Sequence, residues 1–370
     1  MPPLSYLDWN ATAPLRAEAR AALLAAVEGP GNPSSVHRCG REARRAIEDA
    51  RAEIATLVGA AAEDIVFTSG GSEANALALH GGALPVAVSA VEHASVLDAR
   101  ADAERIPVDG QGIVVPEALD ALLAARGPML VSVMMANNET GTIQPIAEIA
   151  ARVHAHGGRL HCDAVQACGR LAVDMAAACI DMLTVSAHKL GGATGSGALV
   201  LRAAPRPEAL IRGGGQERGT RAGTENVPGI AAFGAAARAA RTGRADMAAV
   251  ARLRDALESR VRDAVPETRI LGAGAARLPN TSCLALPGAE AATLVMAMDL
   301  AGIAISAGAA CSSGKVRASH VLAAMGVPSG IAAGAVRVSI GATTTEAEID
   351  RFVREWTILA SRLGSRRVAA

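Results

Sequence analysis

The sequence predicts an α/β protein with a large domain built on a mostly parallel sheet and a smaller α+β domain. Short apolar runs typical of buried strands alternate with longer segments of helical character, which is the pattern of a parallel sheet covered by helices. With 370 residues, of which 51% are apolar, the chain can bury a core for both domains. The strand-like runs of the large sheet are residues 65–68, 85–89, 129–135, 159–162, 182–186 and 197–201.

Helical segments separate these runs and connect the two expected domains. The predicted helices of the first domain are residues 34–58, 73–81, 95–104 and 144–156. A glycine-rich stretch at 213–223 is expected to form an ordered loop, and one long helix at 225–264 should lead out of the large domain. The small domain is predicted from the runs 280–286, 303–306 and 335–340. We place the large domain at 15–245, and the small domain at 246–370 together with an N-terminal segment, 1–14, that should pack near the functional site.

The charge balance and the N-terminus exclude several classes of partner and location. Lysine plus arginine equals aspartate plus glutamate at 36 each, so neither nucleic acid nor an anionic membrane is expected as a main partner. The N-terminus lacks the basic region and apolar core of a signal peptide, so a cytoplasmic protein is expected. The longest apolar stretch, 291–310, is interrupted by Asp299 and by glycines, which is typical of a core segment rather than a membrane span.

The cysteines predict neither disulfides nor an intrinsic metal site. Six cysteines occur with no C-x-x-C pair and no zinc spacing, so the thiols should stay reduced in the cytoplasm. Cys162, Cys179 and Cys283 lie in apolar runs and are expected in the core. Cys39 and Cys168 lie in more polar surroundings, without further support for a role.

A lysine stands where a buried strand is predicted to end. The apolar run 181–185 leads to Lys189, and Gly191 and Gly192 follow it and allow the backbone to turn sharply. A lysine held there is desolvated and rigid, which suits it to form a Schiff base with a carbonyl group. The alternative is an ordinary solvated surface lysine.

Two further strand ends carry groups that a pyridoxal phosphate cofactor requires. Asp163 closes the run 159–162, and an aspartate beside a pyridine nitrogen keeps that nitrogen protonated. Gly71 and Ser72 begin a helix behind the run 65–68, where free backbone amides, a hydroxyl and the positive helix end bind a phosphate. Asp163 could instead be a helix N-cap, and the turn at Gly71 an ordinary strand–helix connection.

Two more polar positions complete the predicted pocket. His93 follows the run 85–89, and Asn138 lies just past the run 129–135. Ligands bind at the carboxyl ends of the strands in open α/β sheets, so polar groups from five strand ends should converge. Because only 2% of the residues are aromatic, His93 is the best candidate to stack on the cofactor ring. Together the five sites predict a pocket for pyridoxal phosphate.

Over nearly its whole length the chain resembles the fold-type I pyridoxal phosphate enzymes of the class V aminotransferase group. More narrowly, it resembles the NifS/IscS-type cysteine desulfurases. The motifs that carry the resemblance occur in family order at residues 6–14, 31–37, 68–73, 92–93, 137–139, 163–166, 186–189, 213–224, 310–315 and 337–341. Two stretches depart from the family pattern. The turn at 191–195 lacks a proline and a basic residue, and Gly71-Ser72 stands where relatives often have Ala-Thr.

The resemblance implies a fold-type I transferase fold, pyridoxal 5'-phosphate as cofactor and a role for each pocket residue. Lys189 forms the Schiff base, Asp163 faces the ring nitrogen, and Gln166 faces the ring hydroxyl. Thr224 reaches the phosphate from a second subunit, so a homodimer is implied. The implied cofactor-binding residues are Gly71, Ser72, His93, Asn138, Asp163, Gln166, Ser186, His188, Lys189 and Thr224.

The resemblance also implies how substrate and sulfur are handled. Arg337 binds the substrate carboxylate bidentately and Asn138 lies near the substrate, although Arg337 could instead form a surface ion pair. Lys189, Cys311 and His93 are the implied catalytic residues. Cys311 lies in a loop of small residues that can expose its thiol, and the alternative is one more buried small residue.

The implied reaction converts L-cysteine to L-alanine and leaves the sulfur as a persulfide on Cys311. An iron–sulfur scaffold protein or another sulfur acceptor would then take the sulfur. Cys311 could also be a transient ligand of an iron–sulfur cluster that is bound at the same time by such a scaffold. One alternative is a class V aminotransferase or selenocysteine lyase, which needs no persulfide loop. Another is a sulfur-carrier or assembly protein that keeps the fold with a decayed site.

Overall fold

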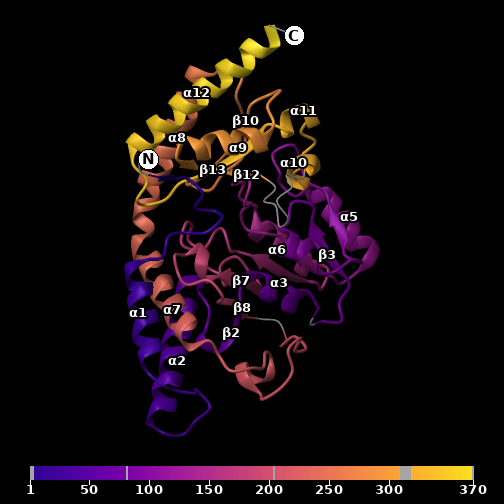
Figure 1. Ribbon diagram of the computed structural model, residues 1–370. Helices are drawn as coiled ribbons and strands as arrows, with labels where there is room; N and C mark the ends of the chain where they lie inside the picture. The colour runs from indigo at the N-terminus through magenta and orange to yellow at the C-terminus, as the bar shows by residue number, and fades with distance from the viewer. Residues whose placement is uncertain (1–3, 81, 203–204, 309–317, 369–370) are drawn as a thin grey trace.

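The protein is built around a seven-stranded sheet with strand order β2-β8-β7-β6-β5-β3-β4 (Figure 1). The computed structural model describes residues 4–80, 82–202, 205–308 and 318–368. The strands from β7 to β4 in this order pair in parallel, whereas β8 is antiparallel to both of its neighbours. The predicted mostly parallel sheet is therefore confirmed. Its strands are β2 (Ile65–Thr68), β3 (Val86–Ser89), β4 (Glu104–Ile106), β5 (Leu130–Ser132), β6 (Arg159–Asp163), β7 (Met182–Ser186) and β8 (Gly197–Leu201).

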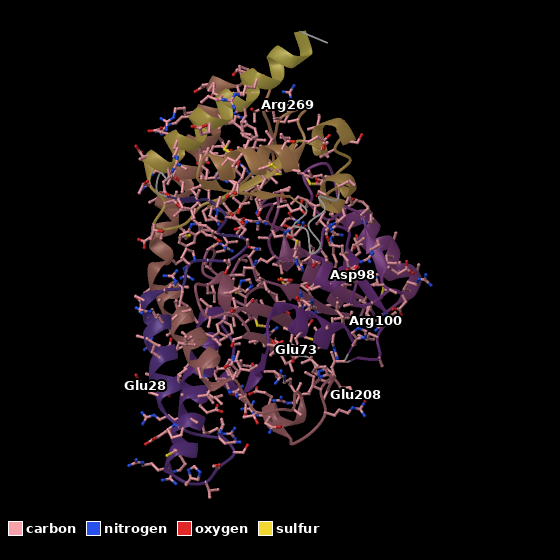
Figure 2. All side chains as sticks on the ribbon, viewed as in Figure 1. Glu28, Glu73, Asp98, Arg100, Glu208 and Arg269 are labelled. Atoms are coloured by element: carbon pink, nitrogen blue, oxygen red, sulfur yellow. The ribbon has the colours of Figure 1, made fainter. Side chains whose placement is uncertain are left out.

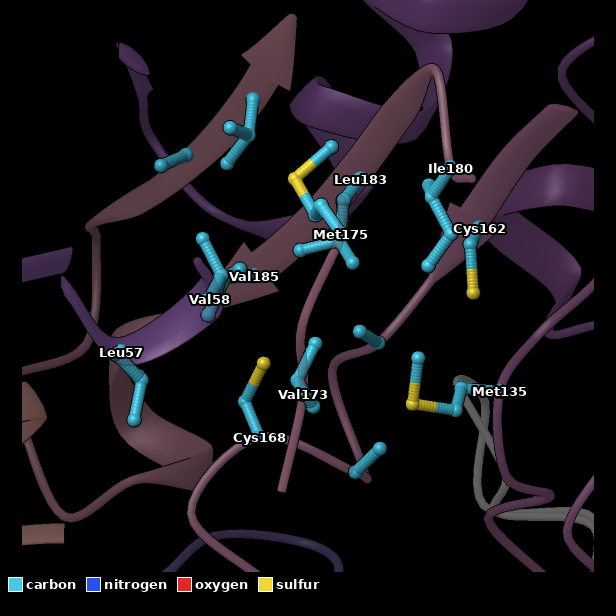
Figure 3. Close-up of a cluster of buried hydrophobic side chains, with 14 of the residues drawn as sticks. Leu57, Val58, Met135, Cys162, Cys168, Val173, Met175, Ile180, Leu183 and Val185 are labelled. Carbon is cyan, nitrogen blue, oxygen red and sulfur yellow. The ribbon is translucent and has the colours of Figure 1, made fainter. Parts of the chain in front are cut away.

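Helices bury both faces of this sheet, because alternate residues of its strands are apolar in both directions. On β8, Val200 packs with residues of α2 (Arg38–Val58) and α7 (Val227–Thr242), whereas Leu199 packs with residues of α3 (Gly71–His80). In the first of these clusters the end of α2 contributes Leu57 and Val58, which lie with Val185 of β7 (Figure 3). The sheet is thus fixed from both sides, and only its strand ends are free to present polar groups.

A second, four-stranded antiparallel sheet follows in the C-terminal part, with strand order β12-β13-β10-β9. Strand β1 (Ser5–Tyr6) pairs in parallel with β11 (Ile303–Ala304), so the start of the chain lies beside this part (Figure 1). Phe352 and Trp356 stack on each other in its core. The domain boundaries 15–245 and 246–370 stay a prediction. The elements here are α8 (Met247–Ala264), β9 (Arg269–Leu271), β10 (Thr281–Ala285), α9 (Ala291–Leu300), β12 (Ser306–Ala307), α10 (His320–Ala324), α11 (Ser329–Ala332), β13 (Ala335–Ser339) and α12 (Glu346–Val368).

Some predicted elements differ from the structure. The predicted helix 95–104 is wrong, because only α4 (Ala94–Leu97) is helical and the strand β4 pairs with β3 at the edge of the sheet. The predicted helix 225–264 is two helices, since Gly243 ends α7 and a short 3₁₀ segment leads into α8. The prediction named neither α1 (Ala17–Glu28) nor α5 (Pro116–Arg126) in the first part of the chain, and none of the helices α9 to α12 in the C-terminal part. Helix α6 spans Ile146–Ala155.

The surface carries the charged side chains that the composition provides. Glu28 on α1 and Arg269 at the start of β9 are both exposed and lie toward opposite ends of the molecule (Figure 2). Within the described part of the chain, no helix combines the length and the apolar character that crossing a bilayer requires. Among the cysteines, Cys162 and Cys283 are buried as predicted. Cys168 is also buried, and Cys179 is exposed, which contradicts its predicted core position.

Candidate active site

The lysine singled out in the sequence lies at the end of a completely buried strand. After β7, one 3₁₀ turn (Ala187–Lys189) presents Lys189, whose Nζ donates to the carbonyl oxygens of Asn10 at 2.5 Å and Ala11 at 2.8 Å. Burial, followed by repulsion from Arg337 and Arg170, lowers the pKa of Lys189 to about 7. Lys189 is therefore not a solvated surface lysine, and its lowered pKa favours the unprotonated, nucleophilic amine.

A tight turn behind Lys189 holds the lysine in this position. Gly191 has a φ of +83°, and a Cβ built on it would lie 2.8 Å from the carbonyl oxygen of Pro14. The N-terminal segment is thus pressed against the turn, and it supplies both carbonyl acceptors for Lys189. The expectation that residues 1–14 pack near the site is confirmed for the described residues of that segment.

Asp163 closes β6, the strand next to β7, and is almost completely buried. Its Oδ2 accepts a hydrogen bond from Asn75 Nδ2 at 2.8 Å, and its Oδ1 accepts one from the backbone N–H of Val165 at 2.9 Å. The second bond closes a turn at residues 163–165, and because no helix begins between β6 and β7, Asp163 is not a helix N-cap. The Asp163 carboxylate therefore stabilises the local turn through Oδ1, while Oδ2 faces Asn75 in the interior of the protein.

The predicted phosphate-binding turn is present where α3 begins. Gly71 is the first residue of α3, and Ser72 beside it is exposed. A Cβ on Gly71 would lie 3.1 Å from Val165 Cγ2 and 3.6 Å from the Cβ of the buried Ser186. The first turn of α3, with its free backbone amides, therefore lies close to the end of β7, and a Cβ at position 71 would require only a small shift of the Val165 side chain.

His188 and His93 lie differently from each other within the site. His188 Nδ1 is 3.2 Å from Thr12 Oγ1, and burial followed by repulsion from Lys189 lowers its pKa to about 4. His93 is the N-cap of α4 and its ring is accessible to solvent, although protein surrounds much of it. This partial desolvation lowers the pKa of His93, and Lys189 adds to the effect. Both imidazoles are thus neutral at physiological pH.

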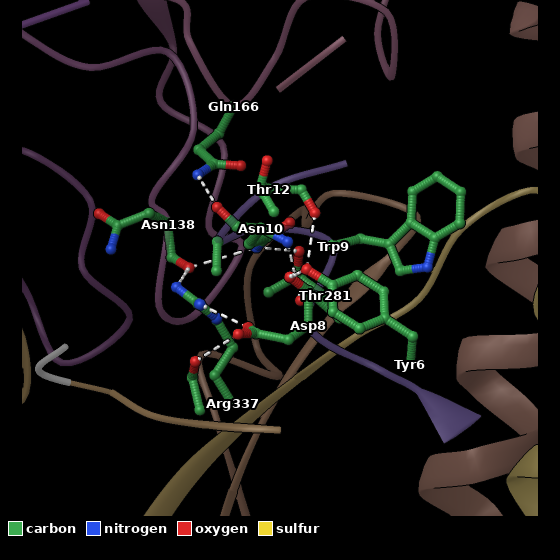
Figure 4. A network of polar contacts seen from close by, with 12 residues as sticks. Tyr6, Asp8, Trp9, Asn10, Thr12, Asn138, Gln166, Thr281 and Arg337 are labelled. Atoms are coloured by element: carbon green, nitrogen blue, oxygen red, sulfur yellow. Dashed lines mark hydrogen bonds and ion pairs between the residues drawn. The ribbon is translucent and has the colours of Figure 1, made fainter. Parts of the chain in front are cut away.

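Arg337 on β13 brings the C-terminal part of the chain to the site (Figure 4). Its Nη2 pairs with Asp8 Oδ1 at 2.8 Å, and its Nη1 donates to the backbone carbonyl of Asn138 at 3.0 Å. The guanidinium is only 3% exposed, so a surface ion pair is excluded. Its Nε is buried and has no hydrogen-bond partner within the described residues. The structure therefore leaves one donor of a planar cation unused.

Asn10 links the two parts of the site (Figure 4). Its Nδ2 donates to the carbonyl of Asn138 at 3.2 Å and to Thr281 Oγ1 at 2.9 Å, and its Oδ1 accepts from Asn280 at 3.0 Å. Its carbonyl also accepts from Gln166 Nε2 at 3.0 Å, in addition to Lys189. The predicted residues Gln166 and Asn138 thus lie at the site, Asn138 by way of its main chain.

The last predicted residues lie apart or outside the described residues. Thr224 is exposed and lines a small cavity with Ser69 and Asn226, and whether it reaches a second subunit stays a prediction. Arg221, in the glycine-rich stretch 213–223, is paired with Glu73 at 2.8 Å. Cys311 lies in the segment 309–317, outside the described residues.

The sequence reasoning missed several residues that hold the site together. Asp8 and Asn10 lie in a recognised motif, but no local signal shows that they contact Arg337 and Asn280. Asn75 lies four residues after Gly71, one helical turn along α3, and that spacing could have placed it at the same end of the sheet. Arg170 is buried and bonds Gln166 Oε1 at 2.8 Å.

These donors and acceptors fit pyridoxal phosphate. The site combines a nucleophilic amine, a buried carboxylate on the neighbouring strand and the start of α3, whose free backbone amides lie near the end of β7. The amine matches an aldehyde, the carboxylate a protonated ring nitrogen, and the helix start a phosphate.

Comparison with known proteins agrees with this chemistry. The sequence pattern of the family described as Aminotransferase class-V matches residues 5–352. The chain belongs to the class-V aminotransferase family. Class-V aminotransferases of this kind have the fold-type I architecture and depend on pyridoxal phosphate.

Individual class-V relatives cover almost all of the chain. A cysteine desulfurase of Cereibacter sphaeroides is 47% identical over 94% of this chain and 93% of its own length. The cysteine desulfurase IscS of Dictyoglomus turgidum is 38% identical over 93% of this chain and 91% of its own. The crystal structure of a NifS-like protein from Rickettsia africae ESF-5 superposes with a TM-score of 0.91 at 34% identity, covering 97% of this chain and 99% of that protein.

Proposed function

We propose that the protein is a pyridoxal phosphate-dependent cysteine desulfurase that converts L-cysteine to L-alanine and keeps the sulfur as a persulfide on Cys311. The observation that carries the proposal is Lys189, an amine with its pKa lowered to about 7, beside Asp163 and Arg337 in one site. Relatives named cysteine desulfurase, at 38–47% identity over nearly the whole chain, support L-cysteine as the substrate.

Residues of the large sheet would hold the cofactor. Asp163 would face the ring nitrogen and Gln166 the ring hydroxyl, because Asp163 ends β6, Gln166 follows three residues later, and both are almost completely buried. His93 would cover the ring with a neutral imidazole. When bound, pyridoxal phosphate supplies a sink for the electron pair that remains when the substrate α-proton is removed. The phosphate would be held by Gly71, Ser72, Ser186 and His188, with Thr224 of a second subunit.

Lys189 would transfer protons to and from the substrate, and Arg337 would bind its carboxylate. The amine of Lys189 is held by two backbone carbonyls, and with a pKa of about 7 it can both accept and return a proton near neutral pH. Arg337 would bind the substrate carboxylate through its unused Nε and one of its terminal nitrogens. Its pair with Asp8 holds the guanidinium plane before substrate arrives, which lowers the entropic cost of binding.

The sulfur step balances without an external oxidant. The Cys311 sulfur forms a bond to the substrate sulfur while the bond from that sulfur to the substrate β-carbon breaks. The electron pair of the broken bond stays with the carbon framework, and proton uptake completes the methyl group of alanine. Cys311 is thereby oxidised from thiol to persulfide, and the β-carbon is reduced to the same extent.

The assembly and the sulfur acceptor are also part of the proposal. A homodimer would place Thr224 at a second site, and the loop before it is held in a defined shape. Glu217, with a φ of +46°, forms a buried bidentate pair with Arg51, whose nitrogens lie 2.9 Å from the carboxylate oxygens. An iron–sulfur scaffold or another acceptor protein would take the persulfide sulfur.

The variant Cys311→Ser tests the proposal. Serine keeps the volume but cannot form a persulfide, so L-cysteine should still change the cofactor spectrum while sulfide release with dithiothreitol nearly vanishes. In the wild type, mass spectrometry should find an adduct of about 32 Da, one sulfur atom, on the peptide that contains Cys311. The exposed Cys179, changed to serine, is the matched control and should release sulfide normally.

Two results would point to the alternatives. Sulfide release at the wild-type rate by Cys311→Ser would favour an aminotransferase or lyase without a persulfide. A wild-type protein that binds no cofactor would favour a carrier protein with a decayed site.

A further inference from the structure

Four side chains form a continuous series of hydrogen bonds from the edge of the site to its buried carboxylate. His93 Nδ1 lies 2.8 Å from Ser95 Oγ, and Ser95 Oγ lies 2.9 Å from Asn75 Nδ2. The same Asn75 nitrogen lies 2.8 Å from Asp163 Oδ2. The series thus joins α4, α3 and β6, and it connects the two groups expected on the face and at the nitrogen of the cofactor ring.

The direction of every bond in the series is determined by its buried end. An ionised Asp163 can only accept, so the amide nitrogen of Asn75, and not its oxygen, faces Asp163. Asn75 is 0% exposed, and its Oδ1 has no hydrogen-bond partner within the described residues. Asn75 then donates its second hydrogen to Ser95, and the Ser95 hydroxyl hydrogen remains for His93 Nδ1.

A second donor confirms the state of the imidazole nitrogen. The backbone N–H of Ser95 also points at His93 Nδ1, at 3.1 Å, and a backbone amide can only donate. Two donors directed at Nδ1 require that it carries a lone pair, so the proton of the neutral ring is on Nε2.

We propose that Ser95 is a positioning residue that holds His93 as the neutral tautomer protonated on Nε2, its hydroxyl joining the imidazole through Asn75 to Asp163. The inference rests on the proposed function, in which His93 covers the cofactor ring and Asp163 faces its nitrogen. Protonating the ring would place a hydrogen on Nδ1, where it would face the hydrogens of the two donors, the Ser95 hydroxyl and backbone N–H. His93 therefore stays neutral, presents an N–H at Nε2 and keeps one ring orientation.

Some of the charged groups around His93 raise its pKa and others lower it. Burial is the largest influence and favours the neutral ring, and Lys189 and His320 repel an additional proton. Asp163 and Asp98 attract it, and Asp98, labelled in Figure 2, is the C-cap residue of α4. The net effect is a lowered pKa of His93, in agreement with the hydrogen-bond direction.

The variant Ser95→Ala tests the inference, with NMR titration of isotope-labelled histidines as the main measurement. Losing one neutral donor to Nδ1 should raise the pKa of His93 by about 0.5–1 unit. The share of the Nε2-protonated tautomer should also fall, while the backbone N–H of residue 95, which the variant keeps, still favours that tautomer. Ser95→Thr keeps the hydroxyl and should restore both values. Ser361→Ala, at an exposed serine on α12, is the matched control and should leave His93 unchanged.

Two results of the titration would count against the inference. An unchanged His93 pKa in Ser95→Ala, with or without a loss of thermal stability, would overturn the inference. An equal rise in Ser95→Ala and Ser95→Thr would overturn it too. If the wild type had no desulfurase activity, the proposed function would fail while the NMR result still decided the role of Ser95.

Discussion

The two sides of the site are built by different means. On one side, Asp163 and Lys189 stand at the ends of adjacent parallel strands, with Asp163 directly opposite Thr184 of β7 in the register. On the other side, Arg337 and Asp8 are separated by 329 positions in the sequence, and their ion pair is accompanied by an isolated β-bridge between Asp8 and Ser339 of β13. The first side follows from sheet topology, which secondary structure enforces. The side formed by Arg337 and Asp8 depends on individual hydrogen bonds between segments that are distant in the sequence.

This difference separates what each side does. The sheet side contributes the groups that would hold the cofactor and move protons, and a rigid parallel sheet suits that role because small displacements there are costly to the rate. The other side would bind the carboxylate of a substrate that enters and leaves. Changes on the sheet side should therefore act on kcat, and changes on the other side should act mainly on KM.

The largest effect is expected from Lys189→Ala on the sheet side. Without this amine, turnover should fall by at least about a thousandfold. Borohydride reduction should no longer attach the cofactor covalently to the protein. The sequence has two lysines, Lys189 and Lys315, so peptide mapping is unambiguous. Lys315→Ala is the control, and covalent attachment in Lys189→Ala would contradict the assignment.

The same comparison explains what could be predicted from the sequence. Lys189, Asp163 and Gly71 follow apolar runs, and parallel strands bring such positions together, so the pattern predicts their convergence. The contacts of Asn10 could not be predicted, because its partners Asn280 and Thr281 lie 270 and 271 positions away. A hydrogen bond between distant segments leaves no periodic signal.

Short or interrupted elements were the other limit of prediction. The strand β4 has three residues, of which only Ile106 is buried, so its sequence carries almost no alternation. Cys179 was predicted in the core because its neighbours are apolar, yet it has a φ of +52° in an exposed turn. In both cases tertiary context decided where local composition could not.

The next largest effect is expected from Asp163→Asn, also on the sheet side. A neutral amide cannot balance a protonated ring nitrogen, and losing a bond to a charged group costs about 1.5–3 kcal/mol, so kcat should fall at least about tenfold. KM for L-cysteine should change little. The measurement is steady-state kinetics on protein fully loaded with cofactor. Normal kcat in such a preparation would contradict the assigned role.

A smaller effect, of a different kind, is expected from Asn10→Ala. The change removes side-chain bonds to Asn138, Thr281 and Asn280 but keeps the backbone carbonyl that holds Lys189. KM for L-cysteine should rise several-fold, and stability should fall by about 1–3 kcal/mol because buried partners lose their bonds. Asn226→Ala, at an exposed helix cap, is the control. If kcat fell more than KM rose, the two sides would not be separable.

The smallest effect on turnover, and a distinct effect on stability, is expected from His161→Gln in the strand beneath the site. His161 is completely buried between Ser132 Oγ at 2.8 Å and Thr184 Oγ1 at 3.0 Å, and burial lowers its pKa to about 4. Its pKa in the unfolded chain is near 6.5, so between these values the unfolded state binds the extra proton. The stability that the neutral ring provides is therefore complete above about pH 6.5 and is lost as the pH falls toward 4.

The pH range between about 6.5 and 4 determines how much folding stability the wild type should lose through His161. Between about pH 6.5 and pH 5 the wild type should lose about 2 kcal/mol through His161, at about 1.4 kcal/mol per pH unit. Glutamine does not titrate and keeps polar contacts within the strand, so the variant should be less stable at neutral pH but lose less on acidification. Thermal unfolding at the two pH values measures both, with the exposed His80→Gln as control. If the melting temperatures of variant and wild type fell equally, the acid sensitivity of the sheet side would come from other groups. His161 would then be a packing residue of the sheet alone.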